Sequence, residues 1–387
     1  MISLANRMSS IEPFHVMDIL AHARQLEAEG KNIVHMEVGE PDFVTLPEIL
    51  EAGRIALAEG KTHYTPATGL AQLREAISAY YQREYDAKVP ANRIVVTPGA
   101  SGALQLALGV LVDPGDGVIM ADPGYPCNRH MVSMFGGVVQ PVNVTASSGF
   151  QLNLELVQAH WQANTRIVML ASPSNPTGTL VQQDELNRIS HFVREQGGIL
   201  IVDEIYHGLI YVDEYGSAVN AGEHIIIINS FSKYFGMTGW RVGWMVVPEQ
   251  LLKPVDNLAQ NIFLAAPTPS QYAALAALDP QLKPALDERR DIFRQRRDYL
   301  LTELRATGFQ IPCEPRGAFY IYANCAEFTS DSLEFSRALL DQAGVAITPG
   351  IDFGGNNSTS YVRFAYTTGM EQLAMGVDAI RKFLSQQ

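Results

Sequence analysis

The segment HIIIINSFSKYFGMTGWRVGW, residues 224–244, joins a short apolar run to a polar turn rich in glycine. The run is continuous rather than alternating, which is typical of a strand buried on both faces of a parallel sheet. Lys233 follows the run closely and lies between serines and glycines, an unusual place for a lysine that serves only solubility. Near the cationic Arg241, a partly desolvated amine would have a lowered pKa and be nucleophilic toward an aldehyde. An ordinary surface lysine is the alternative.

Other apolar runs of the same kind precede this segment, at residues 93–97, 117–121, 166–171 and 198–203. Helix-like segments separate them, at residues 102–112, 126–136 and 182–196. Because strands and helices alternate along the chain, the sequence predicts an α/β fold with a mostly parallel sheet.

The chain has 387 residues, more than one hydrophobic core usually supports, so we expect two domains. Past residue 281 a long charged helix, short strands and further helices replace the alternation, and the first 45 residues resemble that region more than the core. We therefore predict a large domain over residues 46–280 and a smaller α+β domain built from residues 1–45 and 281–387. A helix within residues 245–290 is the candidate junction.

Composition and charge argue against several classes of partner. A net charge of -13 and an isoelectric point near 5.2 disfavour nucleic acid and anionic membrane surfaces. The cysteines are odd in number and widely spaced, and the N-terminus carries no apolar leader, so we expect reduced thiols and a cytoplasmic location. No metal site is expected, because His63, His130 and His207 lack metal-ligand spacing and are assigned packing or pocket-lining roles.

Polar or glycine-rich segments follow nearly every predicted core strand, at the edge where open α/β sheets bind ligands. After residues 93–97, Gly99 turns the chain into a helix whose N–H groups at Ala100 and Ser101 could hold an anion such as phosphate. An ordinary turn between strand and helix explains this segment equally well.

Three further side chains follow other strands at the same edge. The ring of Tyr125 could stack on a flat heterocycle, although packing is the more usual role. Asn175 precedes Pro176 on a stiff loop, which alone indicates only a turn. Asp203 closes an apolar strand and needs a cationic partner there, either a protonated ring nitrogen or a neighbouring arginine.

Taken in order along nearly the whole chain, the motifs resemble those of the class I aminotransferases of pyridoxal 5'-phosphate (PLP) fold type I. These motifs are VGEPDF (38–43), YTPATGLAQLREAI (64–77), DPGD (113–116), DPGYP, SPSNPTG, VDEIY, SFSKYFGMTGWRVG, PRGAFY and YVRFAY. The resemblance implies a large domain with a mostly parallel seven-stranded sheet between helices, and a smaller α+β domain drawn from both termini. It also implies PLP as cofactor and transfer of an amino group between an L-amino acid and a 2-oxo acid.

The resemblance assigns catalytic roles to Lys233, Asp203 and Tyr206. Lys233 is similar to the lysine that holds the cofactor as a Schiff base and then moves the proton between the substrate α-carbon and the cofactor. Asp203 resembles the carboxylate that keeps the pyridine nitrogen protonated. Asn175 and Tyr206 resemble the pair that hydrogen-bonds the phenolic oxygen, and Tyr125 the stacking ring.

Further positions match the cofactor phosphate site and the substrate site. The resemblance implies that the cofactor phosphate is bound by the amide of Ala100 and by Ser101, Ser230 and Arg241. Tyr64 corresponds to a tyrosine that reaches the phosphate of the neighbouring subunit. The resemblance thus implies a homodimer with shared active sites. Substrate binding is implied for Gly39, Asn175 and Arg363, the last as the clamp on the α-carboxylate.

The sequence departs from one subgroup of this family. Some relatives that prefer dicarboxylic substrates carry a lysine where this chain has Ser101, which puts a preference for aspartate in doubt. Arg129, Arg316 or an arginine of the partner subunit could substitute. The substrate pair therefore stays open at this point.

Other functions remain for comparison. A PLP-dependent carbon–sulfur β-lyase would share Lys233, Asp203 and the phosphate site, and Arg363 together with the GMTGWRVG segment favours transamination over it. A nicotinamide dehydrogenase is excluded because no G-x-G-x-x-G opens a helix after a strand. The apolar segment Ile11 to Met17 is a candidate lid over the substrate.

Overall fold

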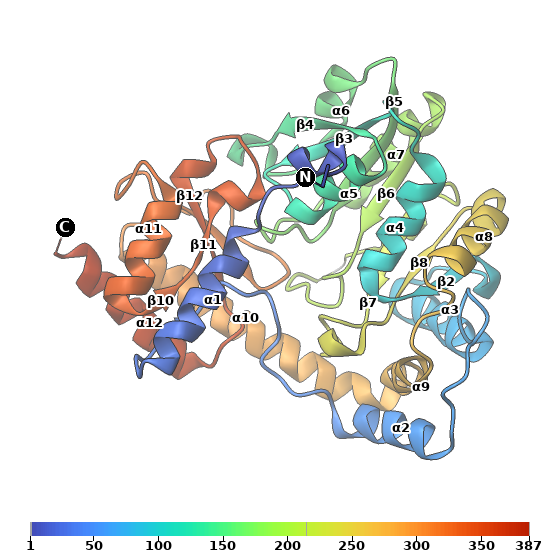
Figure 1. The fold of residues 1–387 in the computed structure, drawn as a ribbon, viewed down its shortest axis with the longest axis horizontal. Coiled ribbons are helices and arrows are strands. Elements are labelled where there is room, and N and C mark those ends of the chain that lie inside the picture. The colour runs from blue at the N-terminus through green and yellow to red at the C-terminus, as the bar shows by residue number, and fades with distance from the viewer. Residues whose placement is uncertain (1, 214, 387) are drawn as a thin grey trace.

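The computed structural model describes residues 2–213 and 215–386, and a seven-stranded sheet forms its centre (Figure 1). The strands of this sheet are β2 (Ile94–Thr97), β3 (Gly117–Asp122), β4 (Val138–Asn143), β5 (Thr165–Ala171), β6 (Ile199–Asp203), β7 (Ile226–Ser230) and β8 (Gly243–Val246). They lie in the order β2-β8-β7-β6-β5-β3-β4. Only β8 runs against its neighbours, so the carboxyl ends of the other six strands meet at one edge. The predicted mostly parallel seven-stranded sheet is confirmed.

Alternate side chains along each strand enter two separate clusters of buried residues. On β2, Val96 belongs to one cluster and Val95 to the other, and on β5 Val168 and Met169 divide in the same way. Because successive side chains of a strand point to opposite faces, each cluster lies on its own face of the sheet. The continuous apolar runs of the sequence thus reflect burial on both sides.

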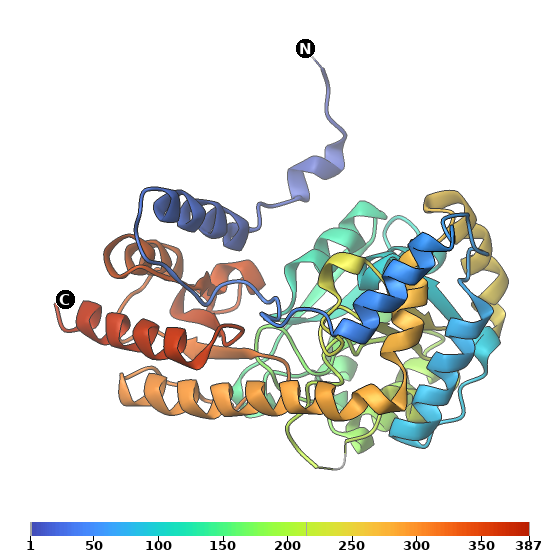
Figure 2. The same cartoon turned by 90° about the horizontal axis from the view of Figure 1, so that it is seen from below.

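Helices cover both faces of the sheet, as Figures 1 and 2 show. The helices of this larger part are α2 (Pro47–Ala58), α3 (Ala71–Tyr85), α4 (Gly99–Leu111), α5 (Pro126–Met134), α6 (Leu154–His160), α7 (Gln183–Glu195), α8 (Leu252–Ile262) and α9 (Thr268–Ala277). Of these, α3, α4, α5, α6 and α7 contact strands of the sheet, and α2, α8 and α9 pack on other helices. Two strands of the sheet were not predicted: β4 alternates at the sheet edge, and β8 is buried throughout but is a short strand within the glycine-rich segment after Lys233.

A smaller part combines both ends of the chain. Its helices are α1 (His15–Ala28), α11 (Ser332–Ala338) and α12 (Met370–Leu384), and its strands are β1 (Val34–His35), β9 (Tyr320–Asn324), β10 (Val345–Ala346), β11 (Thr348–Pro349) and β12 (Tyr361–Ala365). β1 pairs in parallel with β10, which ties the N-terminal region to the C-terminal one. A three-stranded antiparallel sheet, β11-β12-β9, lies beside them. The predicted α+β unit from both termini is confirmed, whereas its limits at residues 46 and 280 stay a prediction.

The long helix α10 (Lys283–Ala306) extends along both parts (Figure 2). Its 24 residues correspond to a length of about 36 Å. The expected junction helix within residues 245–290 is wrong in its position, because α8 and α9 are separate short helices and the long one begins only at Lys283. Within the described residues, no helix is both long and apolar enough to cross a membrane.

Candidate active site

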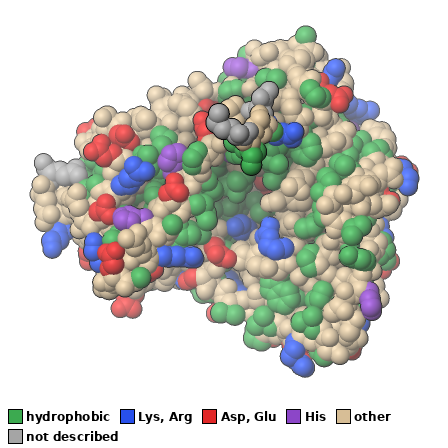
Figure 3. Space-filling view, viewed as in Figure 1, with side chains coloured by type: hydrophobic (Ala, Val, Ile, Leu, Met, Phe, Trp, Pro, Cys, Tyr) green, Lys and Arg blue, Asp and Glu red, His purple; other side chains and the backbone are tan. Residues whose placement is uncertain are grey.

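A cavity of about 260 Å³ opens at the carboxyl edge of the central sheet. Figure 3 shows this face of the molecule hollowed between the two parts, with hydrophobic and basic side chains in the hollow. The predicted site residues that line the cavity are Gly39, Ala100, Ser101, Tyr125, Asn175, Asp203, Tyr206, Lys233, Arg241 and Arg363. The fold therefore gathers segments from both parts of the molecule around one space.

Lys233 enters this cavity from the turn after β7. Its Nζ donates a hydrogen bond to the carbonyl oxygen of Gly39 at 2.7 Å. Burial lowers the pKa of Lys233 to about 8, the carboxylate of Glu40 opposes this shift, and the charges of Arg363 and Arg241 add to it. At neutral pH an appreciable fraction of this amine is therefore neutral and able to act as a nucleophile or a base.

Asp203 is the last residue of β6 and faces the same cavity. Its Oδ1 accepts a hydrogen bond from the backbone N–H of Ile205 at 3.0 Å. Burial raises the pKa of Asp203 to about 6, the Ile205 N–H lowers it, Glu204 raises it and Lys233 lowers it. A carboxylate that burial makes harder to ionise gains strongly from a cationic partner, so this position suits a protonated ring nitrogen.

Arg363 of β12 is buried, and two of its three guanidinium nitrogens are bonded within the protein. Nη1 donates to Oδ1 of Asn175 at 2.8 Å, and Nη2 donates to the carbonyl oxygen of Glu37 at 2.5 Å and to Oγ1 of Thr348 at 3.1 Å. The guanidinium lies 4.2 Å from the ring centroid of Tyr320. Among the described residues, Nε is buried without a hydrogen-bond partner. Three of the five N–H groups of this cation are used in these bonds, and a rigid cation with N–H groups to spare is suited to a carboxylate ligand.

The N-terminus of α4 forms another wall of the cavity, next to Arg241. The residue before the helix, Pro98, provides no side-chain cap, so the first-turn N–H groups at Ala100 and Ser101 stay available. Gly99 has φ of +68°, and a Cβ there would lie 2.5 Å from Nη2 of Arg241. Glycine at this position therefore lets the guanidinium approach the helix end, which gives an anion both a helix dipole and a fixed cation.

Ser230 does not line the cavity, in contrast to its neighbour in the motif, Ser232. The hydroxyl of Ser230 has two acceptors within reach for its one proton, Oγ of Ser232 at 2.9 Å and the carbonyl oxygen of Val242 at 3.2 Å. The role of Ser230 in phosphate binding stays a prediction. Ser232 was missed although it directly precedes Lys233, because nothing in the sequence distinguishes the two serines.

Tyr64 also lies away from the cavity of its own chain. It is in the loop between α2 and α3 and is 83% exposed. Its predicted place in the neighbouring subunit's site stays a prediction.

Two aromatic residues of the site were not singled out by sequence reasoning. The hydroxyl of Tyr320 lies 2.8 Å from that of Tyr206, and a Cβ on Gly39 would collide with it. Phe14 lies edge-on to Tyr125, with ring centroids 6.3 Å apart. Tyr320 is the last residue of the PRGAFY motif, and Phe14 belongs to the expected lid. The sequence therefore indicated that these two segments lie at the site, but not which residues Tyr320 and Phe14 contact there.

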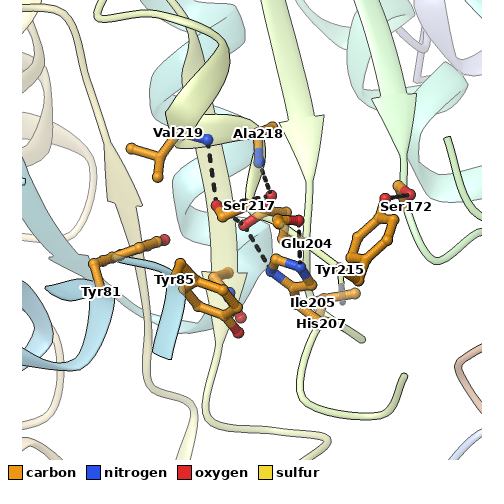
Figure 4. A network of polar contacts seen from close by, with 12 residues as sticks. Tyr81, Tyr85, Ser172, Glu204, Ile205, His207, Tyr215, Ser217, Ala218 and Val219 are labelled. Carbon is orange, nitrogen blue, oxygen red and sulfur yellow. Dashed lines mark hydrogen bonds and ion pairs between the residues drawn. The ribbon is translucent and has the colours of Figure 1, made fainter. Parts of the chain in front are cut away.

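A closed polar network lies directly behind Asp203, and Figure 4 shows it from close by. The carboxylate of Glu204 accepts from the hydroxyl of Ser217 at 2.8 and 3.0 Å and from the backbone N–H of Ala218 at 2.6 Å. Nδ1 of His207 lies 3.1 Å from Oε2 of Glu204, and its ring stacks on Tyr85 at 4.6 Å. Both side chains of this ion pair are almost completely buried.

Comparison with known proteins shows which family this chain resembles in sequence and structure. The family model "Aminotransferase class I and II" matches residues 31–380. The chain is 36% identical to the (5-formylfuran-3-yl)methyl phosphate transaminase of Methanocaldococcus jannaschii, over 99% of this chain and 100% of the relative. It is also 36% identical to the valine–pyruvate aminotransferase of Mycobacterium tuberculosis, over 98% of each. The crystal structure of an aminotransferase from Mycobacterium tuberculosis superposes with a TM-score of 0.97 at 35% identity and covers both chains completely. These names favour transamination over the β-lyase alternative.

Proposed function

This chain belongs to the class I and II aminotransferases and catalyses PLP-dependent transamination, and from that premise we propose that the cavity around Lys233 is its active site. The observation that carries this proposal is the convergence of Lys233, Asp203 and Arg363 on one space, each in the electrostatic setting that the reaction needs. The substrates are an L-amino acid and a 2-oxo acid.

The residues around the cavity fit PLP on three counts. The open N-terminus of α4 with Ser101 and Arg241 suits the phosphate. Asp203 suits the protonated ring nitrogen, and Tyr125 and the amide of Asn175 supply a stacking face and a polar contact for the ring. When bound, the cofactor supplies an aldehyde that takes up the amino group and a ring that accepts electrons from the substrate α-carbon.

Lys233 acts as both the covalent anchor and the proton carrier in this proposal. Its lowered pKa, about 8, leaves the amine partly neutral at neutral pH, so Nζ can accept a proton from the substrate α-carbon and return it to a neighbouring carbon. Its hydrogen bond to the carbonyl of Gly39 holds the amine against the cavity.

Arg363 positions the substrate. Its guanidinium lines the cavity and keeps N–H groups that no protein acceptor uses among the described residues, and these are available to the α-carboxylate, with Asn175 and Gly39 also lining the cavity. Tyr320 fixes the plane of the guanidinium from one side, which orients the α-carbon toward Lys233.

We also propose a homodimer, in which Tyr64 reaches the phosphate site of the second subunit. Its 83% exposure on an isolated chain supports this role. Sedimentation of the holoenzyme tests the assembly, and mixing inactive Tyr64→Ala and Lys233→Ala chains tests the sharing, because shared sites predict recovery of activity in mixed dimers. The cytoplasmic location stays a prediction.

The absorbance spectrum of the cofactor-loaded protein tests the proposed function. Titration with L-amino acids should remove the visible band of the loaded enzyme, and a 2-oxo acid should restore it. A band that persists while pyruvate and ammonia accumulate would contradict transamination and indicate a β-lyase instead.

A further inference from the structure

The side of the cavity away from the sheet is lined by apolar side chains. Phe14, Val16 and Met17 come from the N-terminal segment, and Cys127 and Met131 come from α5. None of these residues has a role in binding the cofactor or the α-carboxylate in the proposal above. With the amide of Asn128, which also lines the cavity from α5, they form a mostly apolar surface, called here the apolar wall, that the proposed contacts to the cofactor and the α-carboxylate do not use.

Polar contacts at two points position the N-terminal segment. At one end, Nη1 of Arg7 donates to the carbonyl oxygen of Met134 at the end of α5. At the other, the buried carboxylate of Asp352 accepts from the backbone N–H groups of His15 and Val16, each at 2.9 Å, where α1 begins. Figure 2 shows this segment projecting from the body of the molecule. Its apolar residues are thus positioned by polar contacts outside the cavity.

The cations of the cavity are already engaged. Among the described residues that line it, the basic ones are Lys233, Arg241 and Arg363, which the proposed function assigns to the amine, the phosphate and the α-carboxylate. Arg129 and Arg316, the candidates to replace the missing lysine at Ser101, do not line the cavity. The guanidinium of Arg129 instead donates to the carbonyl oxygen of Asp352 at 2.6 Å.

These observations decide between substrate classes. Within one chain, a second carboxylate would be desolvated against the apolar wall without a cationic partner, which is unfavourable. An arginine of the partner subunit that reaches this wall is the alternative, and aspartate or glutamate as the best substrate would indicate it. An aliphatic or aromatic side chain would instead gain from removal of its surface from water. We propose that this enzyme selects L-amino acids with neutral, apolar side chains, and the matching 2-oxo acids, through contact with Phe14, Val16 and Met17.

This inference rests on the proposed function, and one panel of substrates shows which of the two fails if either is wrong. The holoenzyme is mixed with L-phenylalanine, L-leucine, L-alanine, L-aspartate or L-glutamate, and kcat/KM of the half-reaction is measured. Phenylalanine or leucine should exceed alanine by about 10-fold or more, and both acidic amino acids should fall below alanine. Aspartate or glutamate as the best substrate would overturn the inference and leave transamination intact. No conversion of any amino acid would overturn the proposed function and the inference with it.

A matched pair of variants tests the wall itself. Phe14→Ala should lower kcat/KM for phenylalanine or leucine by about 10-fold and leave alanine within about 2-fold, because the alanine side chain is too short to use the wall. Leu4→Ala, in the same segment but 74% exposed and outside the cavity lining, is the control and should change neither. An equal loss for alanine and the larger substrates in Phe14→Ala would overturn the contact.

Discussion

Residues 203–207 have two faces, and the two polar clusters on these faces differ in how completely their atoms are bonded. Asp203 and Tyr206 face the cavity, whereas Glu204 and His207 face the network behind it. On the cavity side, Nε of Arg363 has no partner among the described residues. On the network side, Glu204 accepts several hydrogen bonds and each ring nitrogen of His207 faces an oxygen.

This difference distinguishes the residues that bind a ligand from the residues that stabilise the fold around them. Buried polar groups are normally satisfied, so groups left open around a cavity indicate that a ligand completes them. A closed network has no such vacancy, and its contribution is to stability and to the position of the strand end. Changes on the cavity side should therefore reduce activity, and changes on the network side should reduce stability.

The largest effect is expected for Lys233→Ala. Loss of the anchor and proton carrier should lower kcat by about 10,000-fold or more. The thermal midpoint of the apoprotein should be unchanged or higher, because a desolvated amine is removed. Lys253→Ala, an exposed lysine on α8, is the control. More than a tenth of the wild-type turnover in Lys233→Ala would show that this residue is not the proton carrier.

Arg363→Lys should have the next largest effect on activity. The charge is kept but the planar fork is lost, which costs about 1.5–3 kcal/mol, or roughly 10- to 150-fold in kcat/KM. Steady-state kinetics with the best amino acid measure it, with the exposed Arg54→Lys as the control. Unchanged kinetics would show that Arg363 does not bind the α-carboxylate of the substrate.

On the network side, His207→Ala should leave the buried carboxylate of Glu204 without one of its hydrogen-bond partners. Because a buried carboxylate loses one hydrogen-bond partner, a free energy of unfolding lower by about 1–3 kcal/mol is expected, with kcat/KM of the folded enzyme within about 3-fold. Urea unfolding measures the change, and the exposed His191→Ala should stay within about 0.5 kcal/mol of wild type. A large kinetic loss without loss of stability would reverse the assignment of this face.

The last prediction concerns how pH changes the rate of covalent PLP binding, and it tests the state of the Lys233 amine in the cavity. Because the pKa of Lys233 is lowered to about 8, the amine is protonated below that pH and neutral above it. The rate at which the apoprotein binds PLP covalently should rise toward pH 8 and level off above it. Stopped-flow absorbance measures this rate, and a rate that does not change between pH 6 and pH 9 would contradict the lowered pKa.

Much of the fold could be predicted from the sequence, because the strands of the central sheet are buried on both faces and appear as continuous apolar runs. The run before Lys233 and the run that ends at Asp203 were both located in this way. β4 and β8 were missed because one alternates at the sheet edge and the other is a short strand after a glycine turn.

The site was less completely predictable. Residues in motifs, such as Arg363 and Asn175, could be proposed by position, but their hydrogen bond to one another depends on how the two parts of the molecule meet. For the same reason Tyr320 and Phe14 could not be placed, since their contacts join segments far apart in the chain. The network around His207 gave no sequence signal beyond a histidine with an expected packing role.

The most direct test compares two adjacent isosteric substitutions, Asp203→Asn and Glu204→Gln, by kcat/KM and by urea unfolding of each variant. Asp203→Asn should lose about 100-fold or more in kcat/KM and keep its stability, because the partner of the ring nitrogen is removed. Glu204→Gln should keep kcat/KM within about 3-fold and lose at least about 2 kcal/mol of stability, because a closed buried network is broken. Equal losses of activity in the two variants, or a stability loss confined to Asp203→Asn, would contradict the division of this strand end into a catalytic face and a supporting face.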